Sequence, residues 1–224
     1  MTNMASQSAS YLKTDLTPDS LNRIHEPLET ALGNGALVVF PTETFYGLAV
    51  AADNVEALRR LAELKGGRAV KNFPLIADRA ETVAAFANIP KQFVPLIKDF
   101  WPGPLTLSLQ PTKELSQEVL SARGEVGIRV SSSVAARHVA RCAGGLVTAT
   151  SANFGGEGPS RSLDGMSPEL LERVDLVVDA GPCPGGEPST IVGLLDNGEA
   201  MVWRNGALPL EALEESAGIN FLSP

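Results

Sequence analysis

The sequence is poor in the residues that build disulfide frameworks and metal sites. Its 224 residues include 2 cysteines and 2 histidines, and these four residues are Cys142, Cys183, His25 and His138. No CxxC or histidine-linked spacing occurs among them, so the pattern predicts neither a disulfide framework nor a metal site such as a zinc centre. Such sparse cysteine usage is typical of a protein of the reducing cytoplasm.

Long apolar runs and an excess of positive charge are also lacking. No apolar run is long enough to span a bilayer, and the polar start MTNMASQSASYLKTD has neither the basic end nor the apolar core of a signal peptide. Lys and Arg number 18 against 26 Asp and Glu, which gives a formal charge of -8. Because such a surface repels phosphate backbones and anionic lipids, we expect no membrane association and no extensive direct binding of nucleic acid.

The residues that are present fit one globular domain. Apolar residues make up 44% and charged residues 20% of the chain, so the chain can bury a core of ordinary size. We expect a mobile N-terminal tail over residues 1–15 and a single domain over residues 16–224.

Strand-like and helical patterns alternate along this domain, which predicts an α/β fold. Segments rich in Val, Ile, Leu and Thr predict strands at 36–40, 46–52, 104–109, 126–131, 146–151, 175–180, 189–195 and 200–204. The clearest helical pattern begins after Asp53, the expected N-cap with Glu56 as its capping-box partner, and ends at Gly66-Gly67. Further helices are predicted at 79–87, 93–100, 133–143, 168–173 and 209–216. Asn197-Gly198 predicts an antiparallel hairpin between the last two strands, so we expect a mixed sheet.

Small polar residues gather where the predicted strands end, in PTETFYGL, LKGGRAVKNFPLI, VGIRVSSS, ATSANFGGEGPSRS, GGEPSTIV and VWRNGAL. Hydroxyls and amides at strand ends bind ligands by short hydrogen bonds, and nearby Lys and Arg bind phosphates or carboxylates. At most positions a simpler interpretation competes. For Thr42 and Thr44 the simpler interpretation is β-propensity or turn capping. For Lys65 it is the favourable placement of a cation at a helix C-terminus. Local turns are the simpler interpretation for Ser151, Asn153, Ser160 and Arg204.

Arg129 is harder to explain without a ligand. The segment VGIRV otherwise has the pattern of a strand buried on both faces. A buried guanidinium needs an anion or several hydrogen-bond acceptors, so we expect Arg129 to have a functional role.

Seven segments in order resemble the YrdC-like family of threonylcarbamoyl-AMP synthases. They are PTETFYGL, the lysine-led KGGR loop, WPGPLT, VGIRV, TSAN, PSTIV and the closing WRNGA, and together they span nearly the whole chain. The resemblance implies a single YrdC-like domain in which a twisted mixed β-sheet with flanking helices surrounds an open concave cavity. It also implies a nucleotidyltransferase that joins L-threonine, bicarbonate and ATP into threonylcarbamoyl-AMP and releases pyrophosphate. In WPGPLT we expect Trp101 to serve packing and Pro102 and Pro104 to stiffen a turn, so this segment is assigned a structural role.

The resemblance also assigns roles to residues and names partners. It implies that threonine is bound by Thr44, Arg129, Ala149 and Ser189, with Tyr46 and Gly47 shaping the same wall. It implies an ATP side formed by Lys65, Arg68, Ser151, Asn153, Ser160 and Arg204, in which Lys65 and Arg68 are also catalytic. The product would pass to tRNA-modifying proteins for threonylcarbamoyl modification of a tRNA adenosine.

Positioning and charge neutralisation, with no general base, are expected to drive this chemistry. Mg²⁺ is expected to arrive with ATP, because the matched motifs lack the carboxylates of a dedicated metal cage. Two alternatives stay open, namely a YrdC-like paralogue that binds structured RNA and one that uses a different carbamoyl acceptor.

One departure from the family lies in the KGGR loop. The family spaces its lysine and arginine as Lys-x-Arg, whereas here Gly67 stands in the arginine position and Arg68 follows one residue later. Because two glycines give the loop backbone conformations barred to other residues, we expect Arg68 still to reach the ATP phosphates.

Overall fold

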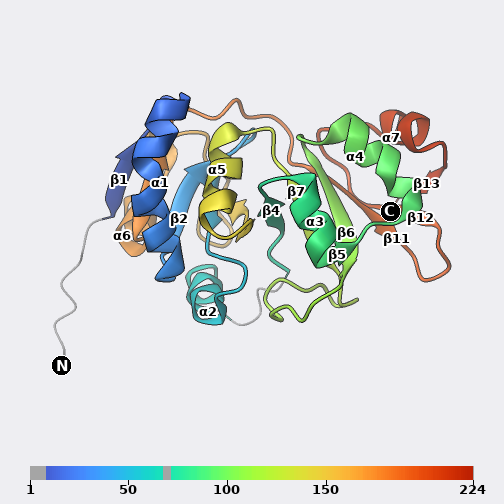
Figure 1. Cartoon of the computed structure of the whole chain (residues 1–224), viewed down its shortest axis with the longest axis horizontal. Coiled ribbons are helices and arrows are strands. Elements are labelled where there is room, and N and C mark those ends of the chain that lie inside the picture. The colour runs from blue at the N-terminus through green and yellow to red at the C-terminus, as the bar shows by residue number, and fades with distance from the viewer. Residues whose placement is uncertain (1–8, 68–71, 224) are drawn as a thin grey trace.

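A computed structural model describes residues 9–67 and 72–223 of the chain. Its strands form two sheets that follow one another along the longest axis of the molecule (Figure 1). The five-stranded sheet has the order β1-β10-β2-β3-β9, with the bounds β1 Ser10–Lys13, β10 Leu176–Asp179, β2 Val38–Pro41, β3 Tyr46–Ala49 and β9 Thr150–Ser151. The eight-stranded sheet has the order β13-β12-β11-β6-β7-β4-β8 and β5 beside β6, with the bounds β13 Phe221–Leu222, β12 Ala200–Arg204, β11 Thr190–Leu194, β6 Leu105–Pro111, β7 Val126–Val130, β4 Leu75–Ala77, β8 Leu146–Thr148 and β5 Ala87–Asn88.

Both sheets mix parallel and antiparallel pairs, so the expected α/β fold with mixed strand directions is confirmed. In the first sheet β1, β10 and β2 run parallel, whereas β3 is antiparallel to β2 and to β9. In the second, β11 and β12 form the predicted antiparallel hairpin, with Gly198 of the Asn-Gly turn at φ 85°. The structure differs from the expectation of one sheet, because the strands divide between two.

Six of the seven helices in the described part of the chain, α2 to α7, agree closely with the predicted ranges. Their bounds are α1 Pro18–Gly33, α2 Val55–Leu64, α3 Ala80–Phe86, α4 Val94–Phe100, α5 Val134–Cys142, α6 Pro168–Arg173 and α7 Leu210–Ala217, with short 3₁₀ turns at Lys91–Phe93 and Leu163–Gly165. The predicted cap of α2 is wrong by one residue. Asn54, and not Asp53, has the extended backbone of an N-cap, and its side chain accepts a hydrogen bond from the Ala57 amide at 3.0 Å.

The N-terminal region corrects the predicted tail. Residues 1–8 lie outside the described residues, but Ser10–Lys13 form strand β1, which pairs in parallel with β10. Helix α1 follows and was not predicted; Thr17 caps it by accepting a hydrogen bond from the Ser20 amide. Apolar side chains at a four-residue spacing on α1 are buried, yet Pro27 lies inside the helix, where proline is normally unfavourable and so weakens the sequence pattern.

The two sheets meet at Ala149. The predicted strand 146–151 is split there: β8 pairs with β4, and β9 pairs with β3 of the other sheet. At the crossing the Ala149 amide donates to the Pro74 carbonyl at 2.8 Å, and the Thr148 amide donates to the Val50 carbonyl at 3.1 Å. The chain therefore passes from one sheet to the other between β8 and β9, and it carries the TSAN motif across the junction.

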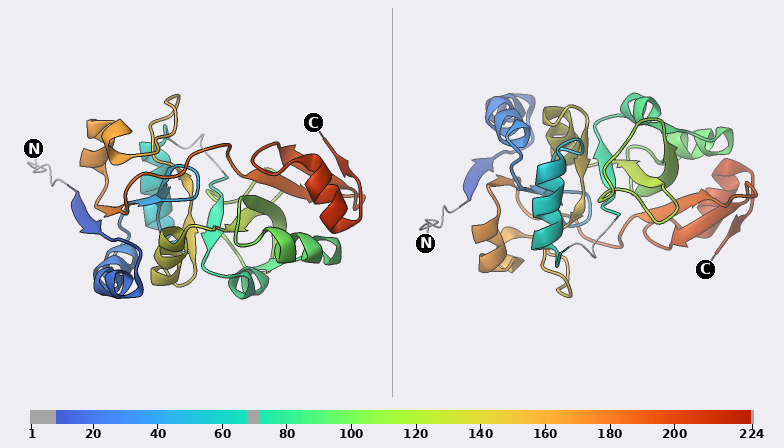
Figure 2. Two further views of the ribbon diagram at one scale, coloured as in Figure 1. Left: turned by 90° about the horizontal axis from the view of Figure 1, so that it is seen from above. Right: turned by 90° about the horizontal axis from the view of Figure 1, so that it is seen from below.

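Helices cover the five-stranded sheet on both sides. Figure 2 shows α1 beside α5 on one side and α6 on the other. The α1–α5 side buries an apolar cluster in which Leu28 and Leu32 of α1 meet Ala136 and Val139 of α5 and Val38 of β2. Among the helices formed by the described residues, none combines the length and the apolar character needed to cross a membrane.

Candidate functional site

A cavity of about 500 Å³ lies at the junction of the two sheets. Of the residues expected to bind ligands, six line it, namely Thr44, Arg129, Ala149, Ser151, Ser189 and Arg204. The remaining lining residues are Thr42, Phe45, Tyr46, Gly47, Pro74, Thr150, Pro159, Gly186, Glu187 and Pro188. Lys65, Asn153 and Ser160 are not part of this lining, and Arg68 lies outside the described residues. The fold thus brings together side chains from segments that are far apart in the sequence.

Arg129 and Glu43 form an ion pair in the wall of the cavity. Arg129 Nε lies 3.5 Å from Glu43 Oε1, and each side chain is 11% exposed. Neither of these two atoms has a hydrogen-bond partner among the described residues. Burial lowers the pKa of Arg129, and the negative charge of Glu43 opposes that shift. Ser131 donates to the other Glu43 oxygen, so the carboxylate is anchored while the guanidinium keeps bonding capacity for an incoming anion.

Glu43 was not among the predicted site residues. The signal for it was present in the sequence, because a buried guanidinium requires an anion and the PTETFYGL segment contains one carboxylate. The sequence alone does not show that β7, which carries Arg129, and the turn between β2 and β3, which carries Glu43, lie side by side. Phe45 and Glu187 also line the cavity and were missed.

Arg204 and Ser189 form a second polar group in the lining of the cavity. Arg204 Nη2 donates to the Ser189 carbonyl at 2.8 Å and to the Ser189 hydroxyl at 2.9 Å. The same hydroxyl shares a hydrogen bond of 2.8 Å with Thr106. Desolvation and the positive charge of Arg129 both lower the pKa of Arg204. Because the two guanidinium groups disfavour each other, an anion bound between them would relieve the repulsion.

Gly206 lets the chain after β12 pass under the loop that carries Ser189. A Cβ atom at this position would lie 2.2 Å from the Pro188 carbonyl oxygen, so no other residue fits without movement of the backbone. The glycine of the WRNGA motif therefore positions the Ser189–Arg204 pair.

The PTETFYGL turn presents one hydroxyl to the cavity and uses another for its own shape. Thr42 Oγ1 donates to the Phe45 carbonyl at 2.7 Å and accepts from the Thr44 amide at 3.2 Å, so it holds the turn. Among the described residues the Thr44 hydroxyl has one partner, the Thr42 hydroxyl at 3.2 Å. The Tyr46 hydroxyl donates to the Gly181 carbonyl at 2.8 Å and so fixes the wall. Of the hydroxyl groups in this turn, that of Thr44 has hydrogen-bonding capacity left for a ligand.

Lys65 lies against the TSAN segment, as expected, but its ammonium group is already bonded. Nζ donates to the Ser151 carbonyl at 3.0 Å, to the Asn153 carbonyl at 2.7 Å and to Asn153 Oδ1 at 3.0 Å. Burial lowers the pKa of Lys65, while the negative charge of Glu157 opposes that effect. These bonds hold Ser151 and Asn153 in place next to the cavity. Helix α2 ends at Leu64 with Lys65 as its C-cap, and the glycine pair that follows Lys65 has positive φ, 116° at Gly66 and 93° at Gly67.

Ser160 has a local role in this structure. Its hydroxyl donates to the Ser162 carbonyl at 2.7 Å, and its carbonyl accepts a hydrogen bond from the Tyr46 amide at 2.9 Å. The second bond joins the end of the 155–160 loop to β3. Ser160 thus closes the loop beside the cavity, which its neighbour Pro159 lines.

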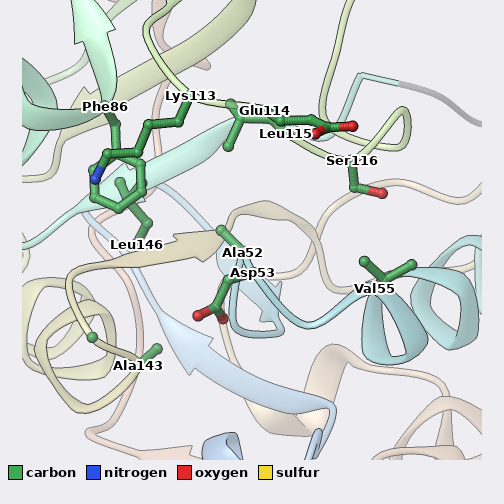
Figure 3. Close-up of a pocket in the computed structure, with 11 residues that line it drawn as sticks. Ala52, Asp53, Val55, Phe86, Lys113, Glu114, Leu115, Ser116, Ala143 and Leu146 are labelled. Atoms are coloured by element: carbon green, nitrogen blue, oxygen red, sulfur yellow. The ribbon is translucent and has the colours of Figure 1, made fainter.

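A second cavity, of about 460 Å³, lies away from these residues (Figure 3). Its lining contains Asp53, Phe86, Lys113 and Glu114 together with apolar side chains, and it contains none of the residues expected to bind ligands. The Lys113 amine lies 4.4 Å from the centre of the Phe86 ring, so this cation is already engaged. The cavity at Arg129 is therefore the better candidate for an anionic ligand.

Comparison with known proteins identifies relatives of the chain. Residues 30–206 match the sequence model of the Sua5_yciO_yrdC family, described as "Telomere recombination". The chain is 34% identical over 192 residues to the threonylcarbamoyl-AMP synthase of Bacillus subtilis, with 84% of this chain and 54% of that protein covered. It is 28% identical over 199 residues to a protein of Methanocaldococcus jannaschii, with 89% of this chain and 93% of that protein covered.

A solved structure resembles the whole fold. The Pyrococcus abyssi Sua5 protein complexed with L-threonine superposes with a TM-score of 0.80 at 26% identity, covering 96% of this chain and 62% of that one. The chain thus spans about half the length of the B. subtilis relative and less than two thirds of the P. abyssi protein, whereas it matches nearly all of the M. jannaschii protein.

Proposed function

Because the chain belongs to the Sua5_yciO_yrdC family, we propose that it forms threonylcarbamoyl-AMP from L-threonine, bicarbonate and ATP, with release of pyrophosphate. The observation that carries the proposal is the cavity at the sheet junction, where the buried Arg129 guanidinium and the Arg204 guanidinium face the same space as the hydroxyls of Thr44 and Ser189. Two cations and two hydroxyls match the carboxylate and hydroxyl of threonine together with the charge of a phosphate.

In this proposal threonine binds on the Arg129 side of the cavity. The Arg129 guanidinium pairs with the substrate carboxylate, and the Glu43 carboxylate keeps that guanidinium charged and correctly placed. The Thr44 and Ser189 hydroxyls hydrogen-bond the substrate hydroxyl, and the Ala149 backbone flanks it at the strand crossing. Fixing the carboxylate and the hydroxyl orients the substrate amine, which is the group that must react.

In this proposal ATP binds on the side of the cavity formed by the TSAN segment. Ser151 lines the cavity, and Lys65 holds Ser151 and Asn153 through their carbonyls. We assign the triphosphate to Lys65, Arg68 and Arg204, and the nucleotide side to Ser151, Asn153 and the loop closed by Ser160. The motifs matched in the sequence lack the carboxylates of a dedicated Mg²⁺ cage. Mg²⁺ would come with the ATP phosphates and neutralise part of their charge.

The chemistry has two bond-forming steps. The threonine amine attacks the carbon of bicarbonate, and loss of water leaves a carbamate. A carbamate oxygen then attacks the α-phosphorus of ATP, and pyrophosphate leaves. Both steps join anions, so the residues of this chain contribute by holding the reactants together and by placing positive charge beside them.

The activity would be exercised where ATP, threonine and tRNA-modifying proteins occur together, and we therefore include a cytoplasmic location and transfer of the adenylate to such proteins in the proposal. The test is mass spectrometry of the products after incubation with ATP, Mg²⁺, threonine and ¹³C-bicarbonate. We expect an adenylate that contains threonine and gains the mass of one ¹³C, with one pyrophosphate per adenylate. An adenylate without threonine, or no adenylate at all, would refute the proposal.

A further inference from the structure

The packing of α1 against α5 brings together a group that the sequence spacing does not indicate. His25 of α1 and His138 and Cys142 of α5 each offer a potential ligand atom, and these three atoms lie within 4.8 Å of one another. The chain has 2 histidines and 2 cysteines in all, so three of its four soft ligand residues meet at one point. This point lies outside the cavity described above, on the side of the five-stranded sheet that α1 and α5 cover (Figure 2).

Helical spacing explains why the three side chains face each other. His138 and Cys142 are four residues apart on α5, and residues at this spacing lie on the same face of a helix. On α1, Glu29 stands four residues after His25, so a carboxylate follows the histidine on the facing helix. Two pairs at a four-residue spacing on adjacent helices make an arrangement in which one cation could join both helices.

One nitrogen of the group is buried and has no hydrogen-bond partner among the described residues. His138 is 6% exposed, and its Nε2 atom has no hydrogen-bond partner among the described residues. The rings of His25 and His138 meet edge to face with their centres 5.2 Å apart, so packing alone does not supply an acceptor or donor for that nitrogen. A buried polar atom without a partner costs free energy unless a ligand satisfies it.

The distances already resemble a coordination sphere. Cys142 Sγ lies 3.3 Å from His25 Nδ1, whereas two ligands of a tetrahedral Zn²⁺ bound through nitrogen and sulfur are about 3.6 Å apart.

A route to the site also exists. Cys142 and Glu29 both line a cavity of about 560 Å³ that opens beside the C-terminal ends of α1 and α5. Glu29 is exposed and can turn toward the group, and its charge already acts on Cys142. Arg141 brings an opposing positive charge close to Cys142 and His138, but it is exposed and can turn into water.

We propose that His25, His138 and Cys142 form a structural site for a thiophilic cation of the Zn²⁺ class, with Glu29 as the fourth ligand. Binding replaces the Cys142 S–H proton by the metal and releases that proton to solvent; no oxidant or reductant is needed. The bound cation links α1 to α5, the helix that connects β7 with β8. The site would stabilise the fold and takes no part in the proposed synthesis of the adenylate.

The test uses the full chain without a polyhistidine tag, stripped of metal with a chelator. Zn²⁺ is titrated against a chromophoric chelator, and Co²⁺ serves as a spectroscopic probe. We expect one equivalent of Zn²⁺ per chain, a thiolate-to-cobalt charge-transfer band with Co²⁺, and an increase in Tm when Zn²⁺ is added. Zinc content measured by elemental mass spectrometry gives the stoichiometry without relying on activity.

Variants distinguish this site from nonspecific binding. Cys142→Ser should abolish the charge-transfer band, and His138→Gln and His25→Gln should each weaken Zn²⁺ binding more than about tenfold, whereas Glu29→Gln should have a smaller effect. Cys183→Ser is the matched control, since Cys183 is the other buried free cysteine, and it should keep both the band and the stoichiometry. His25 is only half-buried, so its variant tests the proposal even if changes on α5 impair folding.

Three results would overturn the proposal. They are absence of stoichiometric Zn²⁺ binding by the wild type, a charge-transfer band that persists in Cys142→Ser, and loss of the band in Cys183→Ser.

Discussion

Arg129 is a buried cation and Lys65 a half-buried one next to the same cavity, yet the protein satisfies them in different ways. The Lys65 ammonium group donates to three oxygens of Ser151 and Asn153. Arg129 faces a single carboxylate at 3.5 Å, and its Nε has no hydrogen-bond partner among the described residues. The proposed threonine side therefore holds a preorganised cation with bonding capacity left. On the proposed ATP side, Lys65 would have to exchange a protein partner before it could bind a phosphate.

This difference has a physical consequence for binding. An under-bonded buried cation gains hydrogen bonds when an anion arrives, so the full charge-assisted bond contributes to affinity. A cation that already has three acceptors gains less, because each new bond replaces an existing one. Mutations on the Arg129 side should therefore change binding more than mutations on the Lys65 side.

The largest effect is expected for Arg129→Ala. Loss of a charge-assisted contact of about 1.5–3 kcal/mol should weaken threonine binding roughly 10- to 150-fold. The variant also leaves Glu43 buried without its positive partner, which should lower the free energy of unfolding. Isothermal titration calorimetry with threonine measures the first effect and urea denaturation the second.

A double variant separates these two effects. Arg129→Ala combined with Glu43→Gln removes the unpaired carboxylate, so it should recover stability while threonine binding stays weak. Wild-type threonine affinity in either variant would show that Arg129 does not bind the substrate carboxylate.

A smaller effect, about tenfold on the KM for ATP, is expected for Lys65→Ala, with threonine binding changed less than about twofold. The variant loses one positive charge and releases the carbonyls of Ser151 and Asn153. Lys65→Arg should not restore the wild type, because a planar guanidinium does not replace a compact ammonium surrounded by three acceptors.

The measurement is adenylate formation as a function of ATP concentration, and Arg68→Ala should give a similar increase in KM if Arg68 reaches the phosphates. If the KM for ATP is unchanged in Lys65→Ala, Lys65 only holds the TSAN segment in place and does not bind ATP.

Gly206→Ala tests whether the Arg129 side depends on close backbone packing. The added Cβ would lie 2.2 Å from the Pro188 carbonyl oxygen, so we expect a loss of about 1–3 kcal/mol of stability and a moderate loss of threonine affinity through displacement of Ser189. Urea denaturation and calorimetry measure the two quantities. Asn205→Ala is the control, because Asn205 is exposed and should tolerate the change. Equal stability of the two variants would contradict the packing argument.

The smallest effect concerns substrate choice. Serine lacks one methyl group of threonine, which corresponds to about 0.8 kcal/mol or roughly a fourfold lower kcat/KM. Valine lacks the hydroxyl and should react more poorly still, because Thr44 and Ser189 would lose a hydrogen-bond partner. Thr44→Val should reduce the difference in kcat/KM between threonine and valine. Competition assays with both amino acids measure these ratios, and comparable yields from valine and threonine in the wild type would exclude a hydroxyl-binding pocket.

Local features of the fold could be predicted because neighbouring residues determine them. The helices from α2 to α7 and the β11–β12 hairpin follow apolar periodicity, capping and the Asn197-Gly198 turn, all of which act over a few residues. Helix α1 was missed although its buried side chains are regularly spaced, because Pro27 interrupts the pattern and tertiary packing overrides that cost. Strand β1 was missed because its partner β10 is far away in the sequence.

The sequence alone determined that Arg129 is a cation in an apolar strand, that Thr44, Ser151 and Ser189 stand at strand ends, and that the segments resemble those of one family. Only the tertiary structure decided which of these groups share a cavity, that Glu43 pairs with Arg129, that Lys65 is held by Ser151 and Asn153, and that His25 meets Cys142 from 117 residues away. The physical reason is range. Capping, periodicity and turns act between neighbours in the chain, whereas ion pairs and ligand sites depend on which surfaces the folded core brings into contact.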